Sequence, residues 1–318
     1  MLTLLLRRLL LGLVTIWLVS GLIFLAVEAL PGDACTAYLQ RDAVGQRLAH
    51  CQAELGLDRP AVLRYLEWIG GALRGDFGFS VNGSRRIAAI VGDRLRNTLL
   101  LAGCTILLGV PLALMLGVIT ALRRDKATDI LLSAFAIFAM TIPEFVSATL
   151  LIFIFSIWLG WLPGIVMASS NAPLGAFFPE IILPVLVLMM VMSAHILRTV
   201  RSSVIDVMAS DYVRMAELKG VPHRRVILCH ALPNALLPAI NIVALTMAWL
   251  LGGVVVVETV FNYPGLGRLM VDAIAERDLH VVQAIALILA AVYVGLNLIA
   301  DLLTHLLNPR LRGMKLGS

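Results

Sequence analysis

The chain has 318 residues, of which 60% are hydrophobic and 14% are charged. A soluble domain has roughly a quarter of its residues charged, so this composition excludes an ordinary soluble protein and indicates an integral membrane protein. The formal net charge of +5 does not indicate a nucleic-acid partner, because the basic residues gather in short segments next to apolar runs, where they set the topology.

Six apolar runs are long enough to cross a membrane, which takes about 20 residues of helix. They are residues 9–30, 98–122, 130–159, 181–197, 235–257 and 281–307. The first run follows Arg7 and Arg8, but it is too long for a signal peptide and has a poor cleavage site, so we expect it to remain as the first span. Pro143 lies inside the third run and predicts a kink or tilt there.

The distribution of basic residues predicts the orientation of the spans. Lysine and arginine recur at both chain ends, at residues 123–126 and at six positions between 198 and 225, whereas residues 163–180 contain none. Basic loops stay on the cytoplasmic side, so we expect both termini and the loop 198–235 in the cytoplasm. Residues 32–97 then lie outside, with short helices near 46–55 and 61–73 that end at the glycines of 75–78.

Two of the four cysteines, Cys35 and Cys51, fall in this outside segment, where disulfides persist. Spacing alone does not decide between a bridge and two free thiols, because it says nothing about geometry. No cysteine or histidine spacing indicates a metal site.

The loop 198–235 contains a short helix with signals at both ends. Asp211 places negative charge at its start and Lys219 places positive charge at its end, as the helix dipole favours. Gly220 can adopt the left-handed conformation that ends a helix, and Pro222 can begin the next one. We therefore predict a helix from 211 to 219 that is capped at both ends.

Tyr212, Met215 and Ala216 are spaced i, i+3 and i+4, which predicts one apolar face on this helix. A short helix with an apolar face among cytoplasmic charges favours docking of a protein partner. The alternative is a connector whose charges only set topology.

No residue pattern supplies a catalytic site or an energy source. A phosphate-binding loop needs a glycine directly before its lysine, and the three lysines follow Asp125, Leu218 and Met314. Ionisable residues inside spans are expensive and therefore candidates for function; they are Glu144, His195, Glu258, and Asp301 with His305. Glu144, next to Pro143, is the deepest. It either lines a polar pathway together with Glu258 or forms a hydrogen bond between helices.

The run Met215, Ala216, three residues, Gly220, nine residues, His230, Ala231, Leu232, Pro233 resembles the coupling-loop motif of bacterial binding-protein-dependent ABC importer permeases. The usual motif is Glu-Ala-Ala, three residues, Gly, nine residues, Ile, one residue, Leu-Pro. Departures occur at Arg214, Met215 and His230. These departures resemble the dipeptide, oligopeptide and nickel subfamily. Further landmarks of that subfamily follow in order at residues 30–33, 56–58, 75–78, 97–99, 261–267 and 308–309.

This resemblance implies the type I ABC importer permease fold, with six transmembrane helices and an extracytoplasmic segment between the first two. It implies a first span plus outside segment (1–93), a permease core (94–307) and a cytoplasmic tail (308–318). The residues expected to contact an ATPase are Asp211, Tyr212, Arg214, Met215, Ala216, Lys219, Gly220, His230, Leu232 and Pro233.

The same resemblance implies a permease subunit without catalytic residues in the bacterial inner membrane. Its partners would be a second homologous permease, two cytoplasmic ATPase subunits that bind ATP and magnesium, and an extracytoplasmic solute-binding protein. A peptide-like solute is the first expectation, with nickel or a metallophore, a glutathione-like or an opine-like solute as alternatives. A proton-coupled secondary transporter using Glu144, His195 or Asp301 has no need of a docking helix, and a membrane scaffold has no need of several polar residues inside its spans.

Overall fold

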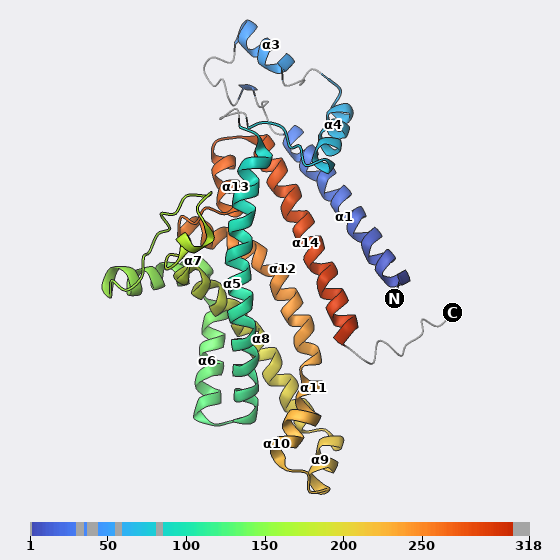
Figure 1. Ribbon diagram of the computed structural model, residues 1–318, viewed down its shortest axis with the longest axis vertical. Helices are drawn as coiled ribbons and strands as arrows, with labels where there is room; N and C mark the ends of the chain where they lie inside the picture. Colours follow the sequence, from blue (N-terminus) through green and yellow to red (C-terminus); the bar gives the residue numbers. More distant parts are fainter. Residues whose placement is uncertain (1, 30–34, 37–43, 55–58, 81–84, 308–318) are drawn as a thin grey trace. The chain divides into compact units, whose positions relative to one another are not determined.

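The computed structural model describes residues 2–29, 35–36, 44–54, 59–80 and 85–307 (Figure 1). In this part of the chain the regular elements are helices, and Phe79 and Arg86 form an isolated β-bridge. Four described helices are long and apolar enough to cross a membrane, and up to six spans result if each of two bent helix pairs counts as one. The all-α membrane class predicted from composition is therefore confirmed.

The chain forms two compact units, each assembled from segments far apart in sequence. The first comprises Met1–Leu99, Ala168–Leu174 and Tyr263–Gly295, and the second comprises Leu100–Met167, Gly175–Asn262 and Leu296–Ser318. The boundaries predicted after residues 93 and 307 stay a prediction.

The first unit holds the N-terminal span and the helices that follow it. It contains α1 (Leu2–Glu28), α3 (Gly45–Glu54), α4 (Ala61–Leu73), the start of α5 (Ile87–Leu122), α13 (Leu266–Ala275) and most of α14 (Leu279–Leu307). On α4 the ring of Tyr65 packs 5.4 Å from that of Phe24, and its hydroxyl lies 2.8 Å from Ser20 Oγ on α1. The two short helices expected outside the membrane are thus present, and α4 is attached to the first span.

A network of buried hydrogen bonds connects residues from three distant segments of the sequence within this unit. The side-chain amide of Asn97, which is fully buried, donates to the carbonyl oxygens of Ser170 and Pro264 at 2.9 Å each. The hydroxyl of Tyr263 donates to the carbonyl oxygen of Asn97 at 2.8 Å. A buried polar group is costly unless it is hydrogen-bonded, so this network fixes the start of α5 against the turn before α13.

The second unit is built around α8. It contains the rest of α5, α6 (Ala127–Thr141), α7 (Glu144–Leu151), the π-helical turn η2 (Ile152–Trp158), α8 (Ile182–Met208), α9 (Asp211–Leu218), α10 (His223–Arg225), η4 (Val226–Ala231), α11 (Leu232–Ala235) and α12 (Leu237–Val260). Small residues let the helices approach: a Cβ on Gly117 of α5 would lie 2.7 Å from Cβ of Val200. Ala136 and Ala139 of α6 pack against Ala194 of α8. Close helix contact through small residues is typical of membrane proteins.

Helix α8 is longer than the sequence predicted. The fourth span was expected to end at residue 197, where the polar loop would begin, but α8 continues to Met208. Val200 and Val204 are buried in the same core as Ala235, so apolar contacts hold the helix together after its exposed face has become charged. The predicted end of the span was placed where charged residues begin, and it did not take the burial of these two valines into account.

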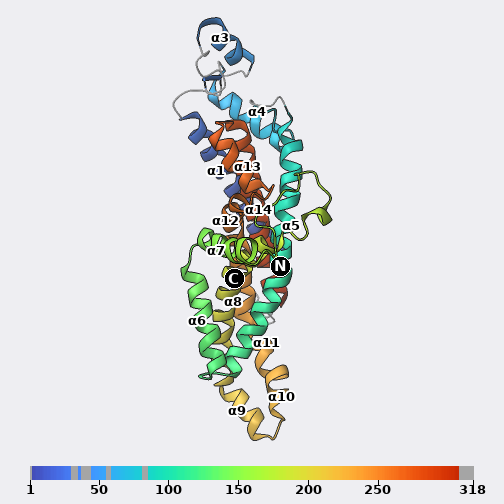
Figure 2. The same cartoon turned by 90° about the vertical axis from the view of Figure 1, so that its left-hand side faces the viewer.

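The third span is broken as Pro143 predicts. Ile142 and Pro143 both have extended backbones, with ψ of 128° and 144°, and the helices on either side differ in direction by 111°. Proline disfavours a helical conformation in the residue before it and lacks the N–H that would continue the helix. Figure 2 shows α7 running across the direction of α6.

Candidate coupling site

The C-terminus of α9 has the hydrogen-bond pattern that a glycine permits. Gly220 has φ of +78°, its N–H donates to the carbonyl of Glu217 at 2.9 Å, and the N–H of Val221 donates to the carbonyl of Ala216 at 3.2 Å. These two bonds form a Schellman motif, and Val221 also packs on the cluster that contains Ala216. The predicted stop signal is confirmed. Pro222 then precedes α10.

The N-terminus of α9 has the predicted acidic residue but no side-chain capping bond. Ser210 has the extended backbone of a capping residue, but its side chain makes no capping bond and its hydroxyl donates instead to the carbonyl of Val207 at 2.5 Å. Asp211 is exposed in the first turn, where its charge favours the helix. The predicted acidic start of α9 is therefore confirmed, and Ser210 adds no side-chain capping bond to it.

The apolar surface of α9 is divided between an inner and an outer part. Val213 and Ala216 are 1% and 8% exposed and pack with Val226 and Ala231 of η4. Tyr212, Met215 and Leu218 are 44%, 53% and 82% exposed; we call these three the outer stripe. The prediction of one exposed face that includes Ala216 is wrong, because Ala216 is needed to attach α9 to the unit.

Charged residues border the outer stripe. Arg214 is exposed, Lys219 is exposed at the end of the helix, and Glu217 lies 3.3 Å from Nδ1 of His223. An exposed apolar stripe bordered by charges at the aqueous end of a membrane unit is suited to a protein contact. Figure 1 shows α9 and α10 beyond the end of α8.

Rigid contacts connect α9 to the central helices. Ser203 of α8 donates its hydroxyl to the carbonyl of Ala235 at 2.7 Å, and Leu232 packs on the α8 core. His230 lies within η4, where Nδ1 is 3.4 Å from the carbonyl oxygen of Arg225, and Pro233 lies in α11. The segment His230–Pro233 thus forms part of the connection from α9 to α12, while the outer stripe is exposed.

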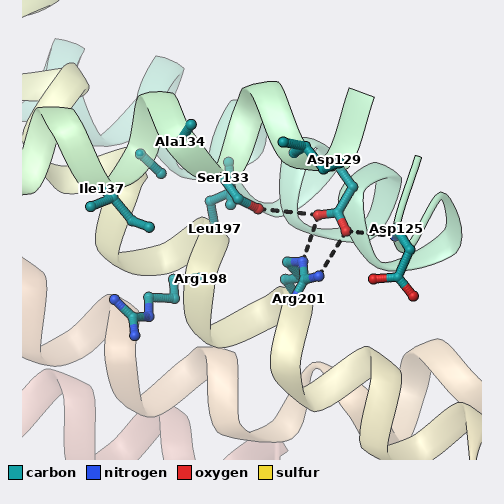
Figure 3. A pocket seen from close by; sticks show the side chains of 10 residues that line it. Asp125, Asp129, Ser133, Ala134, Ile137, Leu197, Arg198 and Arg201 are labelled. Carbon is teal, nitrogen blue, oxygen red and sulfur yellow. Dashed lines mark hydrogen bonds and ion pairs between the residues drawn. The ribbon is translucent and has the colours of Figure 1, made fainter. Parts of the chain in front are cut away.

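An ion pair that the sequence argument did not predict connects α6 to α8 in the same unit (Figure 3). Nε and Nη2 of Arg201 on α8 donate to the two carboxylate oxygens of Asp129 at 2.6 and 2.7 Å. The Asp129 carboxylate also accepts from the Asp125 N–H at 3.0 Å and from Ser133 Oγ at 3.1 Å, and its side chain is 3% exposed. A buried carboxylate with four donors is a strong local constraint. The sequence did not predict this pair, because each residue lies in a predicted charged loop where its charge was explained by the orientation of the spans.

The candidate pathway residues occupy the bend and the helix beside it. Pro143 is exposed and Glu144 is partly buried at the start of α7, with Oε1 3.5 Å from where a Cβ on Gly253 of α12 would lie. Trp249 borders the same glycine, and its ring is 6.2 Å from that of His195 on α8. Glu144 and His195 therefore both lie near one stretch of α12, residues 249–253.

Glu258 lies further along α12 and is fully buried. Five residues of helix separate it from Gly253, which corresponds to about 8 Å along the axis. Their role in a solute pathway stays a prediction.

The proposed bridge between Cys35 and Cys51 is only partly within the described structure. Cys35 is fully buried. The side chain of Cys51 lies outside the described residues, so the bridge stays a prediction.

Comparison with known proteins defines the class of this chain. Residues 113–313 match the family described as binding-protein-dependent transport system inner membrane component, and residues 1–102 match the N-terminal family of the same systems. The chain is 35% identical over 307 residues to the probable peptide ABC transporter permease protein y4tP of Sinorhizobium fredii, covering 96% of this chain and 98% of that one. It is 37% identical over 304 residues to the glutathione transport system permease protein GsiC of Escherichia coli K12, covering 95% of this chain and 97% of that one.

The chain belongs to the family of binding-protein-dependent ABC importer permeases. It is a multi-pass membrane protein and a permease subunit, not itself an enzyme, and it works in a complex with an ATPase and a binding protein. The resemblance inferred from the loop motif is thereby confirmed.

Proposed function

We propose that this chain forms half of the membrane channel of an importer for a peptide-like solute, and that α9 receives the force of ATP hydrolysis. The second half is a homologous permease, and two cytoplasmic ATPase subunits hold ATP and magnesium. This chain lacks the phosphate-binding loop that such ATPases use, since none of its lysines follows a glycine.

The outer stripe of α9 is the observation that supports the coupling role. Its three apolar side chains are exposed, while Val213 and Ala216 on the opposite side attach the helix to η4. A partner that moves the outer stripe therefore also moves η4 and, through the bond of Ser203 to Ala235, the contact between α8 and α11. A passive connector has no need of a glycine-closed helix with both an attached and an exposed apolar side.

A charge placed on the outer stripe tests this role without disturbing the attached side. Met215→Glu and Leu218→Glu should weaken co-purification of the ATPase subunits and reduce import, because each buries a charge in the contact. Glu217→Ala is the control, because Glu217 is an exposed residue of the same helix whose partner is the exposed His223. Normal import by both glutamate variants would show that the force enters elsewhere.

The peptide-like solute is supported by the relatives. One of them is named as a peptide permease and another as a glutathione permease, and glutathione is itself a tripeptide. Calorimetry on the partner binding protein with di- and tripeptides, glutathione, nickel and an opine tests this directly. Tight binding of nickel or an opine, with no peptide bound, would refute the peptide assignment.

We further propose six spans in the bacterial inner membrane, with both termini and α9 in the cytoplasm and α4 outside. The six spans arise from the four long helices and the two bent pairs. The support for the orientation is the basic loop at residues 123–126 and the basic stretch 198–225. Reporter fusions at Leu73 and Arg224 should report opposite sides of the membrane; the same side for both would refute the orientation.

A further inference from the structure

A pocket lies between the ends of α6 and α8, beside the Asp129–Arg201 ion pair (Figure 3). It has a volume of about 430 Å³ and opens to the surface of the second unit. Neither the motif of the loop nor the coupling role of α9 accounts for it. Along α6 its lining mixes polar and apolar side chains, with Asp129 and Ser133 on one hand and Ile130, Ala134 and Ile137 on the other.

The pocket is lined by two aspartates and two arginines, and within the described residues three of these four charges have a partner. The charge of Arg201 is neutralised by Asp129, and Asp125 lies 3.5 Å from the guanidinium of Arg124. Arg198 also lines the pocket and is exposed, and within the described part of the chain it has no hydrogen-bond or ion-pair partner. Figure 3 shows its guanidinium directed away from the Asp129 carboxylate. An anion that enters the pocket would therefore meet one free guanidinium.

The apolar part of the lining is suited to a chain of CH₂ groups. Leu197, which lines the pocket from α8, is buried, whereas Ile130 and Ile137 are 61% and 54% exposed along α6. Asp129 and Ile137 are eight residues apart, about 12 Å of helix, and the guanidinium of Arg198 lies on the Ile137 side of the pocket (Figure 3). A free phosphate ion would use this guanidinium but none of the apolar lining.

We propose that this pocket binds an anionic phospholipid of the cytoplasmic leaflet, with the headgroup phosphate at Arg198 and an acyl chain along Ala134 and Ile137. Basic pockets between membrane helices on the cytoplasmic side are suited to anionic headgroups. The proposal uses the cytoplasmic orientation of this end of the unit. A lipid bound here bridges α6 and α8 beside the ion pair, at the end of α8 that leads into α9.

The test is lipid retention by the purified, assembled importer in detergent, measured by native mass spectrometry during titration with phosphatidylglycerol or phosphatidylcholine. Arg198→Gln should raise the dissociation constant for phosphatidylglycerol about five-fold, which corresponds to about 1 kcal/mol for one basic residue at the membrane surface. Ala134→Trp, which fills the apolar part and leaves all charges in place, should also weaken binding. Arg224→Gln removes the same charge from α10 and should have no effect on this site.

Several results would overturn the proposal. Equal losses of phosphatidylglycerol affinity in Arg198→Gln and Arg224→Gln would mean general attraction to a basic surface. Equal affinity for the two lipids would mean that the headgroup charge does not contribute to binding. Displacement of the lipid by inorganic phosphate would mean a free-anion site. A cross-link from Ser133→Cys to the second permease would mean that a protein covers the pocket. None of these measurements uses the import assay, so the lipid proposal can be refuted while the proposed importer function still stands. Unchanged elution and subunit composition of each variant confirm that it is folded.

Discussion

Replacement of Gly220 by valine isolates the contribution of one backbone conformation to coupling. The residue has φ of +78°, and a Cβ built on it meets no atom within 4 Å. Any cost is therefore conformational and not a clash. A side chain in the left-handed region costs about 1–2 kcal/mol, and valine is β-branched and lies at the upper end of that range. Relief of the strain breaks the bonds from Gly220 and Val221 that end α9.

The consequence for α9 is large because the helix is short. Eight residues do not form a stable helix alone, so α9 depends on its cap and on the packing of Val213 and Ala216. A loss of 1–2 kcal/mol lowers the ratio of folded to locally unfolded α9 by about 5–30-fold.

Amide hydrogen exchange over residues 211–221 of the assembled importer measures this ratio, and uptake into proteoliposomes measures coupling. Gly220→Val should lose protection by that factor and lose most of its import. Gly220→Asn is the matched control, because asparagine tolerates the left-handed region, and it should stay close to the wild type. Wild-type protection and import in Gly220→Val, or a greater loss in Gly220→Asn, would refute the reasoning.

Three more expectations follow from contacts elsewhere in the chain. Gly117→Ala should destabilise the purified protein, because the new Cβ lies within 3.0 Å of α8 atoms, whereas Gly103→Ala on the same helix meets nothing within 4 Å and should be neutral or stabilising; thermal melts of the two compare them directly. Asp129→Ala should lower the free energy of unfolding by about 3 kcal/mol, since it leaves a partly buried arginine without its carboxylate, and an unchanged denaturation midpoint would argue against the brace. If Cys35 and Cys51 are bridged, the loop they close is worth about 3 kcal/mol in the chain-entropy model, and two thiols that can be alkylated in the native protein would rule the bridge out.

The sequence was sufficient where one residue type determines the backbone. Pro143 predicted the break between α6 and α7, and Gly220 predicted the end of α9, because each acts through its own φ or its missing N–H. The family was predictable for a related reason, since the coupling-loop motif combines such backbone signals at fixed spacing.

The sequence was insufficient where the answer depends on which helices pack together. Ala216 and Met215 are adjacent apolar residues of one short helix, yet the first is buried and the second is half exposed, because η4 covers only one side of α9. The end of α8 and the Asp129–Arg201 pair were missed for the same reason, since Asp129 and Arg201 are 72 residues apart and charge counting cannot show that they meet.

A route for force can be followed through the second unit from these contacts. A push on the outer stripe of α9 reaches η4 through Val213, and the segment that follows η4 is tied to α8 through Ser203. Helix α8 is closely packed on α5 at Gly117 and is braced to α6 by Arg201, so it resists bending and is suited to moving as a rigid body. The break before Glu144 interrupts the backbone hydrogen bonds between α6 and α7, so the two helices are not held together as one continuous helix. Movement of α8 and α12 would then change the surroundings of Glu144, where an ionisable side chain meets α12 at Gly253. The proposed coupling helix α9 and the candidate pathway residues are thus connected by packed contacts, and the ion pair and the proposed lipid pocket lie beside them.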